Sequence, residues 1–320
     1  MKQIRVDRSF IAADALTEVI AEEYDLDVTG CKLFSKMMRT QDNDHYLLRT
    51  GGGEKYVARV YQEGSHLERQ EDDYQFELDW LNFLKSRDMP VSYPMARRNG
   101  SFLGSVNAPE GLRYYAVFSF ANGNPMDLED LDQLYECGAK MAQIHVVSND
   151  YQGSYKRQPM DLAFLVDRPV ARLKRFWGED PKRADDLDLL LTSAEEARVE
   201  IEVLLDNEFE SPDSWGPIGG DFHSASTYFD EQNGPTFFNF DLCGYGWRAY
   251  DIATFLLNTN LMHTSTEGTE AFIAGYYSVR RLNENEHAAI SPFLTIRRIW
   301  LTGSFARRRG LVGHTFIAPA

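Results

Sequence analysis

The sequence predicts an α+β fold of two lobes, a small antiparallel sheet lobe followed by a larger and mainly helical lobe. Up to about residue 120, short runs of β-branched and aromatic residues alternate with glycine-containing turns. Beyond that point apolar residues recur mostly at the intervals of amphipathic helices. We therefore expect an N-terminal sheet lobe over residues 1–120 and a C-terminal helical lobe over residues 121–320.

The N-terminal lobe is expected to begin with a helix and a hairpin. Residues from Ala12 to Tyr24 mix alanine, leucine, isoleucine and glutamate at helical spacing, which predicts a short leading helix. The β-forming runs Tyr46 to Thr50 and Tyr56 to Tyr61 flank the three glycines Gly51 to Gly53. Two such runs joined by a glycine turn predict a β-hairpin.

One helix and two further strands complete this lobe in the prediction. An apolar stripe indicates a helix from about Arg69 to Leu84, which ends before Pro90. Strands are expected at Gly100 to Val106 and at Arg113 to Phe120.

The C-terminal lobe follows a cluster of turn-forming residues from Asn122 to Pro125. Helical spacing of apolar residues then predicts helices around residues 134–144, 163–177 and 194–205. Only short strands, near residues 228 and 238, interrupt this helical part. The two lobes thus differ clearly in the kind of element that builds them.

Composition excludes several classes of protein. A formal net charge of −16 argues against a nucleic-acid partner, because such binding depends on lysine and arginine that neutralise phosphates. Residues Met1 to Asp7 lack the apolar stretch of a signal peptide, and no run is long enough to span a bilayer. The cysteines Cys31, Cys137 and Cys243 have neither metal-ligand nor disulfide spacing. We expect a cytoplasmic protein with no nucleic-acid or membrane partner.

Polar residues that could carry chemistry gather between residues 219 and 251. Phosphoryl transfer needs a carboxylate that orients the acceptor hydroxyl and oxygen ligands for magnesium. Asp221, in a Gly-Gly-Asp turn, is the candidate for the first role, with His223 two residues beyond it. Ser226 in the same loop and Asn239 on the following strand occupy the expected positions of metal ligands.

Each of these residues also has a purely structural interpretation. Asp221 could be a turn carboxylate, and His223 could be a histidine that packs the loop. Arg248 and Asp251 could form only a structural ion pair. The ordered combination of all these residues is what favours the functional interpretation.

The order of motifs is similar to that of the aminoglycoside phosphotransferase and choline kinase family, the small-molecule branch of the protein-kinase fold. The family's catalytic loop reads His-Gly-Asp-x-His-x-x-Asn, and Gly220, Asp221 and His223 match it. A later family segment, Ile-Asp-Phe followed by Gly-Tyr-Gly-x-Arg-x-Tyr-Asp, resembles Phe240 and the run Gly244 to Asp251. The resemblance extends over nearly the whole chain. It implies a bilobal protein-kinase-like fold with ATP as the phosphoryl donor and Mg²⁺ as the metal.

The resemblance also implies roles for residues of the N-terminal lobe. Arg59 stands where the family holds the nucleotide phosphates, and Glu77 stands in the position of its ion-pair partner. The segment Thr40 to Tyr46 would cover the nucleotide. Main-chain groups around Ser119 and Phe120 would bind adenine, and the acceptor would lie in the C-terminal lobe.

Three positions depart from the family pattern. Gly219 replaces the family's histidine, Ser226 replaces its metal-binding asparagine, and Asn239 replaces its metal-binding aspartate. Loss of a carboxylate beside a divalent cation removes roughly 4 kcal/mol per unit-charge pair at about 4 Å and an effective dielectric of 20. Magnesium binding should therefore be weakened. Asp241 could compensate, since it would lie on the same side as Asn239 if the strand were regular.

Two functions follow from this pattern. One is an ATP-dependent kinase that acts on a small-molecule or peptide hydroxyl with a degraded metal site. The alternative is a pseudokinase, a binding or scaffolding subunit with a protein partner and without efficient phosphoryl transfer.

A basic stretch near the C-terminus stands out on this acidic chain. It contains Arg297, Arg298 and the run Arg307 to Arg309. Such a stretch could receive an acidic partner, but pairing with the chain's own acidic residues is the preferred interpretation.

Overall fold

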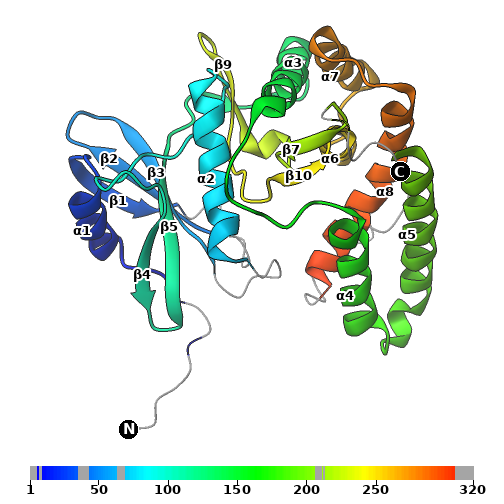
Figure 1. The fold of residues 1–320 in the computed structure, drawn as a ribbon, viewed down its shortest axis with the longest axis horizontal. Coiled ribbons are helices and arrows are strands. Elements are labelled where there is room, and N and C mark those ends of the chain that lie inside the picture. The colour runs from blue at the N-terminus through cyan, green and yellow to red at the C-terminus, as the bar shows by residue number, and fades with distance from the viewer. Residues whose placement is uncertain are drawn as a thin grey trace. The chain divides into compact units, whose positions relative to one another are not determined.

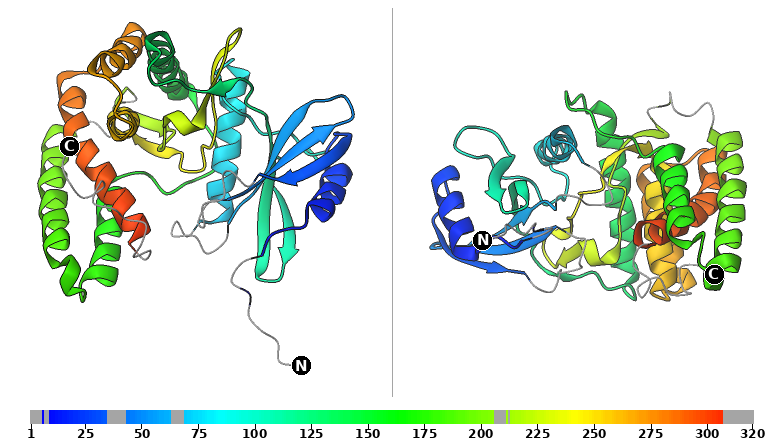
Figure 2. Two further views of the ribbon diagram at one scale, coloured as in Figure 1. Left: turned by 180° about the vertical axis from the view of Figure 1, so that it is seen from behind. Right: turned by 90° about the horizontal axis from the view of Figure 1, so that it is seen from below.

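The chain divides into two units in the computed structural model, which describes residues 6, 9–34, 43–62, 69–205, 211 and 213–306 (Figures 1 and 2). The first unit takes in residues 1–86, 91–121 and 153–155, and the second takes in residues 87–90, 122–152 and 156–320. The chain thus passes into the second unit at residue 122, with two short segments exchanged. The functional assignment of the two ranges stays a prediction.

The first unit is built on one antiparallel sheet with strand order β1-β2-β3-β5-β4. Its core lies between this sheet and α1 (Ala13–Glu23), the predicted leading helix, which inserts Leu16 and Ile20 against it. Figure 1 shows α1 beside β1 and β2. The strands are β1 (Val28–Leu33), β2 (Asp44–Thr50), β3 (Lys55–Val60), β4 (Gly104–Ala108) and β5 (Gly111–Ser119).

The predicted hairpin is confirmed as β2 and β3, which pair from Asp44 with Val60 to Arg49 with Lys55. Gly53 in the connecting turn has a φ of 91°, which glycine adopts without the steric cost that a Cβ would bring. The strand predicted at residues 100–106 was placed too early. Gly100, with a φ of 86°, belongs to a turn in which its N–H bonds to Arg97 O at 2.8 Å, so the strand begins later, at Gly104.

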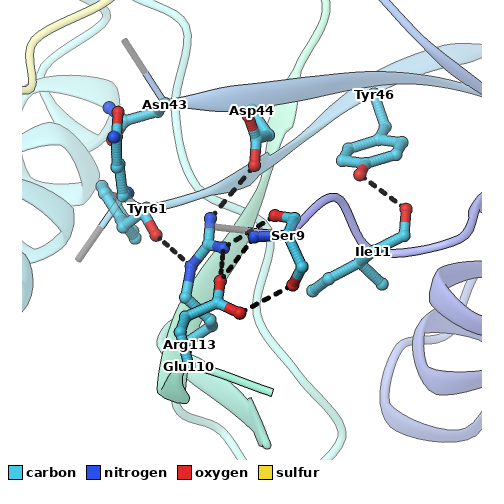
Figure 3. Close-up of polar contacts among 9 residues, drawn as sticks. Ser9, Ile11, Asn43, Asp44, Tyr46, Tyr61, Glu110 and Arg113 are labelled. Carbon is cyan, nitrogen blue, oxygen red and sulfur yellow. Dashed lines mark hydrogen bonds and ion pairs between the residues drawn. The ribbon is translucent and has the colours of Figure 1, made fainter. Parts of the chain in front are cut away.

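A buried arginine ties the sheet together at one end (Figure 3). Arg113 on β5 forms ion pairs with Asp44 at 3.1 Å and with Glu110 at 2.8 Å. Its Nε donates to the carbonyl oxygen of Tyr61 at 2.8 Å, and Glu110 accepts from the hydroxyl of Ser9 at 2.7 Å. Because Arg113 is only 1% exposed, each of these partners offsets part of the cost of burying its charge.

The helix α2 (Glu71–Ser86) begins and ends two residues later than predicted. Its first turn carries Glu71, Asp72 and Asp73, whose negative charge interacts favourably with the N-terminal end of the helix dipole. The buried face includes Phe76, Glu77, Leu78, Trp80, Leu81 and Leu84. A carboxylate in that apolar row requires a partner, and Arg59 provides it.

Six α-helices make up most of the second unit in the described part of the chain. α3 packs on α7, while α4, α5 and α6 pack on α8 (Figures 1 and 2). Gly138 and Gly275 let α3 and α7 approach closely, since a Cβ at either would lie within 2.0 Å of a carbonyl oxygen of the other helix. The helices are α3 (Leu131–Val147), α4 (Arg168–Trp177), α5 (Ala184–Leu205), α6 (Arg248–Leu261), α7 (Thr266–Val279) and α8 (Glu284–Phe305).

Short strands hold the segments that carry the catalytic motifs. β7 (Trp215–Ile218) pairs with β10 (Gly244–Trp247). A second small sheet has the order β6-β8-β9. Its strands are β6 (Asn124–Pro125), β8 (Thr227–Asp230) and β9 (Gly234–Phe237).

Three details differ from the predicted elements of the second unit. The helix predicted over 194–205 begins earlier, since α5 starts at Ala184. β9 ends at Phe237, so the strand expected near residue 238 does not include Asn239. The helix predicted over 163–177 starts with a π-helical turn at Ala163–Asp167, and α4 begins at Arg168. None of the helices in the described ranges combines the length and apolar content that a membrane crossing needs.

Candidate functional site

In the first unit, the sheet and α2 bring Arg59 and Glu77 into direct contact. Nη1 of Arg59 lies 2.5 Å from Oε1 of Glu77, and the two residues are 5% and 0% exposed. The hydroxyl of Tyr61 donates to Oε2 of Glu77 at 3.1 Å, and the guanidinium lies 4.5 Å from the ring centroid of Phe118. Both oxygens of Glu77 are thus occupied, which fixes the orientation of Arg59 near the end of β3.

The segment predicted to bind adenine has part of its main chain already engaged. The N–H of Ser119 donates to Tyr93 O at 2.9 Å, and its carbonyl oxygen accepts from the hydroxyl of Ser92 at 2.6 Å. Phe120 follows β5 directly, and Nζ of Lys55 lies 5.2 Å from its ring centroid. Of the two predicted residues, Phe120 is therefore the better placed to offer main-chain groups to a base.

The segment expected to cover the nucleotide is only partly described. Residues 40–42 lie outside the described ranges. Asn43 Oδ1 accepts from the N–H of Gln62 at 3.0 Å, and Asp44 is paired with Arg113. These two polar residues anchor the start of β2.

In the second unit, Asp251 on α6 fixes the loop that leads to Asp221. Its Oδ2 and Oδ1 accept from the N–H groups of Gly219 and Gly220, both at 2.7 Å. Gly220 has a φ of 74°, and a Cβ there would lie 2.6 Å from Sδ of Met160. Only glycine fits this position, so the main chain around Asp221 is defined by its neighbours.

A chain of buried hydrogen bonds supports Asp251 from behind. Arg280 donates to the hydroxyl of Tyr276 at 3.1 Å, so this hydroxyl uses its own proton on Nδ1 of His145, at 2.8 Å. The opposite nitrogen of His145, Nε2, then donates to Oδ2 of Asp251 at 3.1 Å. The donor pattern assigns a neutral His145 and an acceptor carboxylate at Asp251.

Burial acts on the protonation of both members of this pair. It lowers the pKa of His145 well below 6.5, and the nearby Arg248 and Arg280 lower it further. Burial also raises the pKa of Asp251 to about 7, although the N–H groups of Gly219 and Gly220 act in the opposite direction. Since Asp251 accepts three N–H groups, the geometry is that of the ionised carboxylate.

The ion pair considered for Arg248 and Asp251 is not formed by direct contact among the described residues. Arg248 is fully buried and donates to the carbonyl oxygen of Pro217, and at 2.9 Å to Oδ1 of Asn149. Asp251 bonds instead to the glycine loop and to His145. The two residues therefore hold different parts of the site, Arg248 the strand β7 and Asp251 the loop after it.

The structure places Asp221, His223 and Ser226 close together. Oδ2 of Asp221 lies 3.7 Å from Nε2 of His223, and that nitrogen lies 3.0 Å from Oγ of Ser226. Oδ1 of Asp221 accepts from Nη2 of Arg297, on α8. The Asp221 side chain is 19% exposed, so it is accessible while one of its oxygens is held from within.

Asn239 lies near this loop, because the N–H of Phe238 donates to the carbonyl oxygen of Ser226 at 3.0 Å. The φ of Asn239 is 68°, in the left-handed region that asparagine and aspartate adopt more readily than other residues with a side chain. The main chain is therefore not a regular strand here, and the alternation that would have put Asp241 on the same side as Asn239 does not apply. Asp241 is half-buried, and Arg157 donates to its carbonyl oxygen.

These donors give a limited fit to a magnesium ion. Ser226, Asn239 and Asp241 offer the hard oxygen atoms that magnesium prefers, but only Asp241 offers a charge. The hydroxyl of Ser226 is within hydrogen-bond distance of His223. Across the described ranges there is no group of three or more His, Cys, Asp or Glu residues positioned to hold a metal.

Arg297 was missed as a site residue, because the sequence showed it only as part of a basic stretch. It pairs with Asp221, a carboxylate of the chain itself, as the preferred interpretation of that stretch expected. Arg307 to Arg309 lie outside the described residues. The role of His145 was also missed, and no spacing in the sequence connects it to Asp251.

Comparisons with known proteins find relatives that extend over most of this chain. The model of the phosphotransferase enzyme family matches residues 39–290. An uncharacterised protein of Synechocystis sp. is 31% identical over 91% of this chain and 77% of its own length. A homoserine kinase of Phenylobacterium zucineum is 26% identical over 88% of this chain and 80% of its own.

A solved structure shows the same fold. The kinase hAmiN, in complex with AMP-PNP, Ca²⁺ and amicoumacin, superposes with a TM-score of 0.74 over 94% of this chain and 89% of its own, at 20% identity. The predicted α+β, protein-kinase-like fold is thereby confirmed. The extent of the family match settles the resemblance seen in the sequence: the chain belongs to the phosphotransferase enzyme family.

Proposed function

We propose that this protein is an ATP-dependent kinase that transfers the γ-phosphoryl group to a hydroxyl of a small molecule. The observation that carries the proposal is the setting of Asp221. Its loop is fixed by two N–H bonds to Asp251, its Oδ1 is held by Arg297, and its side chain keeps access to solvent. A carboxylate held in this way is suited to orient an acceptor hydroxyl.

In the transfer step, the oxygen of the acceptor hydroxyl bonds to the γ-phosphorus, and Asp221 accepts the proton of that hydroxyl. The bond from that phosphorus to the β,γ-bridging oxygen breaks, and ADP leaves with the electron pair. His223, with Nε2 at 3.7 Å from Oδ2, limits the directions in which this carboxylate can point. Asp221 and His223 are thus the proposed catalytic residues.

The first unit would bind the nucleotide. Arg59, fixed by Glu77, offers a permanently charged guanidinium to the phosphates. Main-chain groups of Phe120, and to a smaller extent Ser119, would bind adenine. In this arrangement the ion pair between Arg59 and Glu77 stays intact.

Ser226, Asn239 and Asp241 stay the proposed ligands of Mg²⁺, although the left-handed main chain at Asn239 removes the strand geometry that would have placed Asp241 on its side. When bound, the ion would neutralise charge on the phosphates. An aspartate at position 239 would give the site two carboxylates, whereas this chain has only one. We therefore propose that the affinity of the site for Mg²⁺ is reduced. The loss of one unit charge at about 4 Å corresponds to roughly 4 kcal/mol before water compensates. The enzyme should then need a high magnesium concentration.

The acceptor class follows from the relatives. The names of two of them describe kinases of homoserine and of amicoumacin, both of them small molecules. The net charge of −16 is compatible with a cationic acceptor. A peptide acceptor and a protein partner stay predictions of the sequence alone.

A second candidate function is a nucleotide-binding protein that transfers phosphate poorly or not at all. The contacts and charges of three side chains in the candidate site favour this function. Ser226 contacts His223, Asn239 carries no charge, and Asp221 is neutralised by Arg297. In this case the protein would bind nucleotide and act as a binding or scaffolding subunit for a protein partner.

Thermal melting with ATP, in the presence and absence of magnesium, separates the two functions when it is combined with an assay of ADP formation. The kinase predicts stabilisation by ATP that increases with magnesium, and ADP formation that Asp221→Asn abolishes. A shift with ATP but no turnover at any magnesium concentration would support the binding protein. No shift with any nucleotide would overturn both.

A further inference from the structure

The two oxygens of Asp221 have different surroundings. Oδ1 accepts from Nη2 of Arg297, whereas Oδ2 faces Nε2 of His223 at 3.7 Å, beyond hydrogen-bond distance. A carboxylate that orients a hydroxyl needs one oxygen free of strong donors. Among the described contacts, Oδ2 is the oxygen that meets this requirement.

Arg297 is itself rigidly held. It is 5% exposed, and its guanidinium lies 4.8 Å from the ring centroid of Trp300, one turn further along α8. Its Nη1 lies 3.4 Å from the hydroxyl of Tyr250 and 3.5 Å from the carbonyl oxygen of Gly220, the residue before Asp221. The arginine therefore contacts both the side chain and the preceding main chain of the catalytic carboxylate.

A charge in this position is maintained at all relevant pH values. Burial alone would lower the pKa of Arg297, but the Asp221 carboxylate raises it above the usual value. An arginine stacked on an indole also loses little mobility when it bonds, since its planar group is already oriented. The feature thus has the properties of a fixed support and not of a mobile surface charge.

We propose that Arg297 is a positioning residue for the transfer reaction, a role that rests on the proposed kinase function. It holds Oδ1 of Asp221 so that Oδ2 accepts the proton of the acceptor hydroxyl while that hydroxyl attacks the γ-phosphorus and ADP leaves. In this role Arg297 acts through Asp221 and the main chain of Gly220, not by contact with a substrate. This assigns the C-terminal helix α8 a part in catalysis.

The alternative is an ion pair that only stabilises the second unit. A stabilising pair would affect melting, but the surviving folded protein would turn over normally. A positioning residue would instead affect kcat in the folded protein, with the KM values for ATP and acceptor nearly unchanged. The steady-state split between kcat and KM is therefore the decisive readout.

The experiment compares Arg297→Lys and Arg297→Met with Arg298→Met, which removes the same charge from the next position of α8. ATP turnover is measured at saturating magnesium and at a temperature where each variant is folded. We expect Arg297→Met to lower kcat on the order of 10²-fold, because small displacements of a catalytic group have effects of this size. Arg297→Lys should recover part of the loss, since it keeps the charge without the planar fork. Arg298→Met should keep the wild-type kcat.

Two outcomes would contradict the proposal, and they are distinguishable. If the wild type turns over and folded Arg297→Met keeps the wild-type kcat, the positioning role is wrong while the kinase function stands. If the wild type shows no turnover, the substitutions at Arg297 and Arg298 are repeated in the double variant Ser226→Asn/Asn239→Asp. An absence of turnover there too would overturn the kinase function and the positioning role together.

Discussion

Gly219 and Phe222 share one space at the catalytic loop: a Cβ on Gly219 would lie 2.5 Å from Cε2 of the Phe222 ring. This ring is 4% exposed and packs edge-on against Phe237 and Phe240, with centroids 5.2 and 5.6 Å apart. The ring of Phe222 thus fills the space beside Gly219 that the histidine side chain of the family pattern would need. The departure at 219 is structurally compensated.

Gly219→Ala is therefore expected to destabilise the protein by about 1–3 kcal/mol, the usual cost of overpacking a well-packed core. The free energy of unfolding, measured by denaturant titration, checks this. Phe222→Leu in the same protein should remove most of the penalty of Gly219→Ala, because it vacates the ring edge. If Gly219→Ala lowers the free energy of unfolding equally with Phe or with Leu at position 222, residues 219 and 222 do not compete for space.

The buried pair of Arg59 and Glu77 predicts a strong effect of its disruption. Glu77→Gln leaves the Arg59 charge buried without its counter-ion, which costs about 3–5 kcal/mol for pairs of this kind. It should also weaken the ATP-induced shift of the melting temperature, because Arg59 loses its orientation. Glu18→Gln, on the exposed side of α1, is the matched control and should leave both properties unchanged. A Glu77→Gln protein with wild-type melting and nucleotide binding would contradict this role.

The His145 and Asp251 pair predicts a pH dependence of stability. The folded-state pKa of His145 lies below 6.5, so its contribution to stability is present above pH 6.5 and is lost as pH falls below that value. Asp251 acts in the opposite direction, since its pKa is raised to about 7 and its contribution is lost as pH rises through that value. The two effects partly cancel in the wild type.

His145→Gln should separate them, because glutamine can bond to both neighbours and cannot take up a proton. Relative to wild type, this variant should become more stable as pH falls from 6.5 to 5.5, by at most about 1.4 kcal/mol per pH unit. Melting curves across this range measure the difference. The exposed His287→Gln serves as the control. Parallel curves for wild type and His145→Gln would contradict the linkage.

The left-handed main chain at Asn239 predicts which substitutions it accepts. Asn239→Ala should lower the free energy of unfolding by up to about 1–2 kcal/mol, because the short polar side chain of asparagine can bond to nearby main chain at a φ of 68° and alanine lacks such a group. Asn239→Gly should be close to neutral, and Asn239→Asp should fold as well as the wild type. Denaturant titration of the three variants tests the order. An alanine variant as stable as the glycine variant would contradict it.

Much of the fold could be predicted, because local patterns determine it. The hairpin around Gly51 to Gly53 and the helices α1 and α2 have clear periodicity, and the structure moves their ends by only one or two residues. The start of β4 was misplaced, since the turn at Gly100 competes with extension. The strand near 238 was extended too far because an aromatic run also occurs in loops.

The site was predictable only where residues are close in the chain. Asp221, His223 and Ser226 lie within six positions, and the structure brings them together. Arg297 and His145 lie far from Asp221 in sequence, and helix packing places them in this network. No pattern of neighbouring residues contains that information.

The proposed weakening of the magnesium site at Ser226 and Asn239 can be measured by a magnesium titration of ADP formation. The comparison is between the wild type, Asn239→Asp and Ser226→Asn/Asn239→Asp, at saturating ATP and with a small hydroxyl-bearing acceptor such as homoserine. Asn239→Asp is included by itself because Ser226 is buried and a larger side chain there risks displacing His223. We predict turnover in all three proteins and at least a tenfold lower half-saturating magnesium concentration in the variants, equivalent to about 1.4 kcal/mol. The same magnesium requirement in all three proteins, or no turnover in any of them, would contradict it.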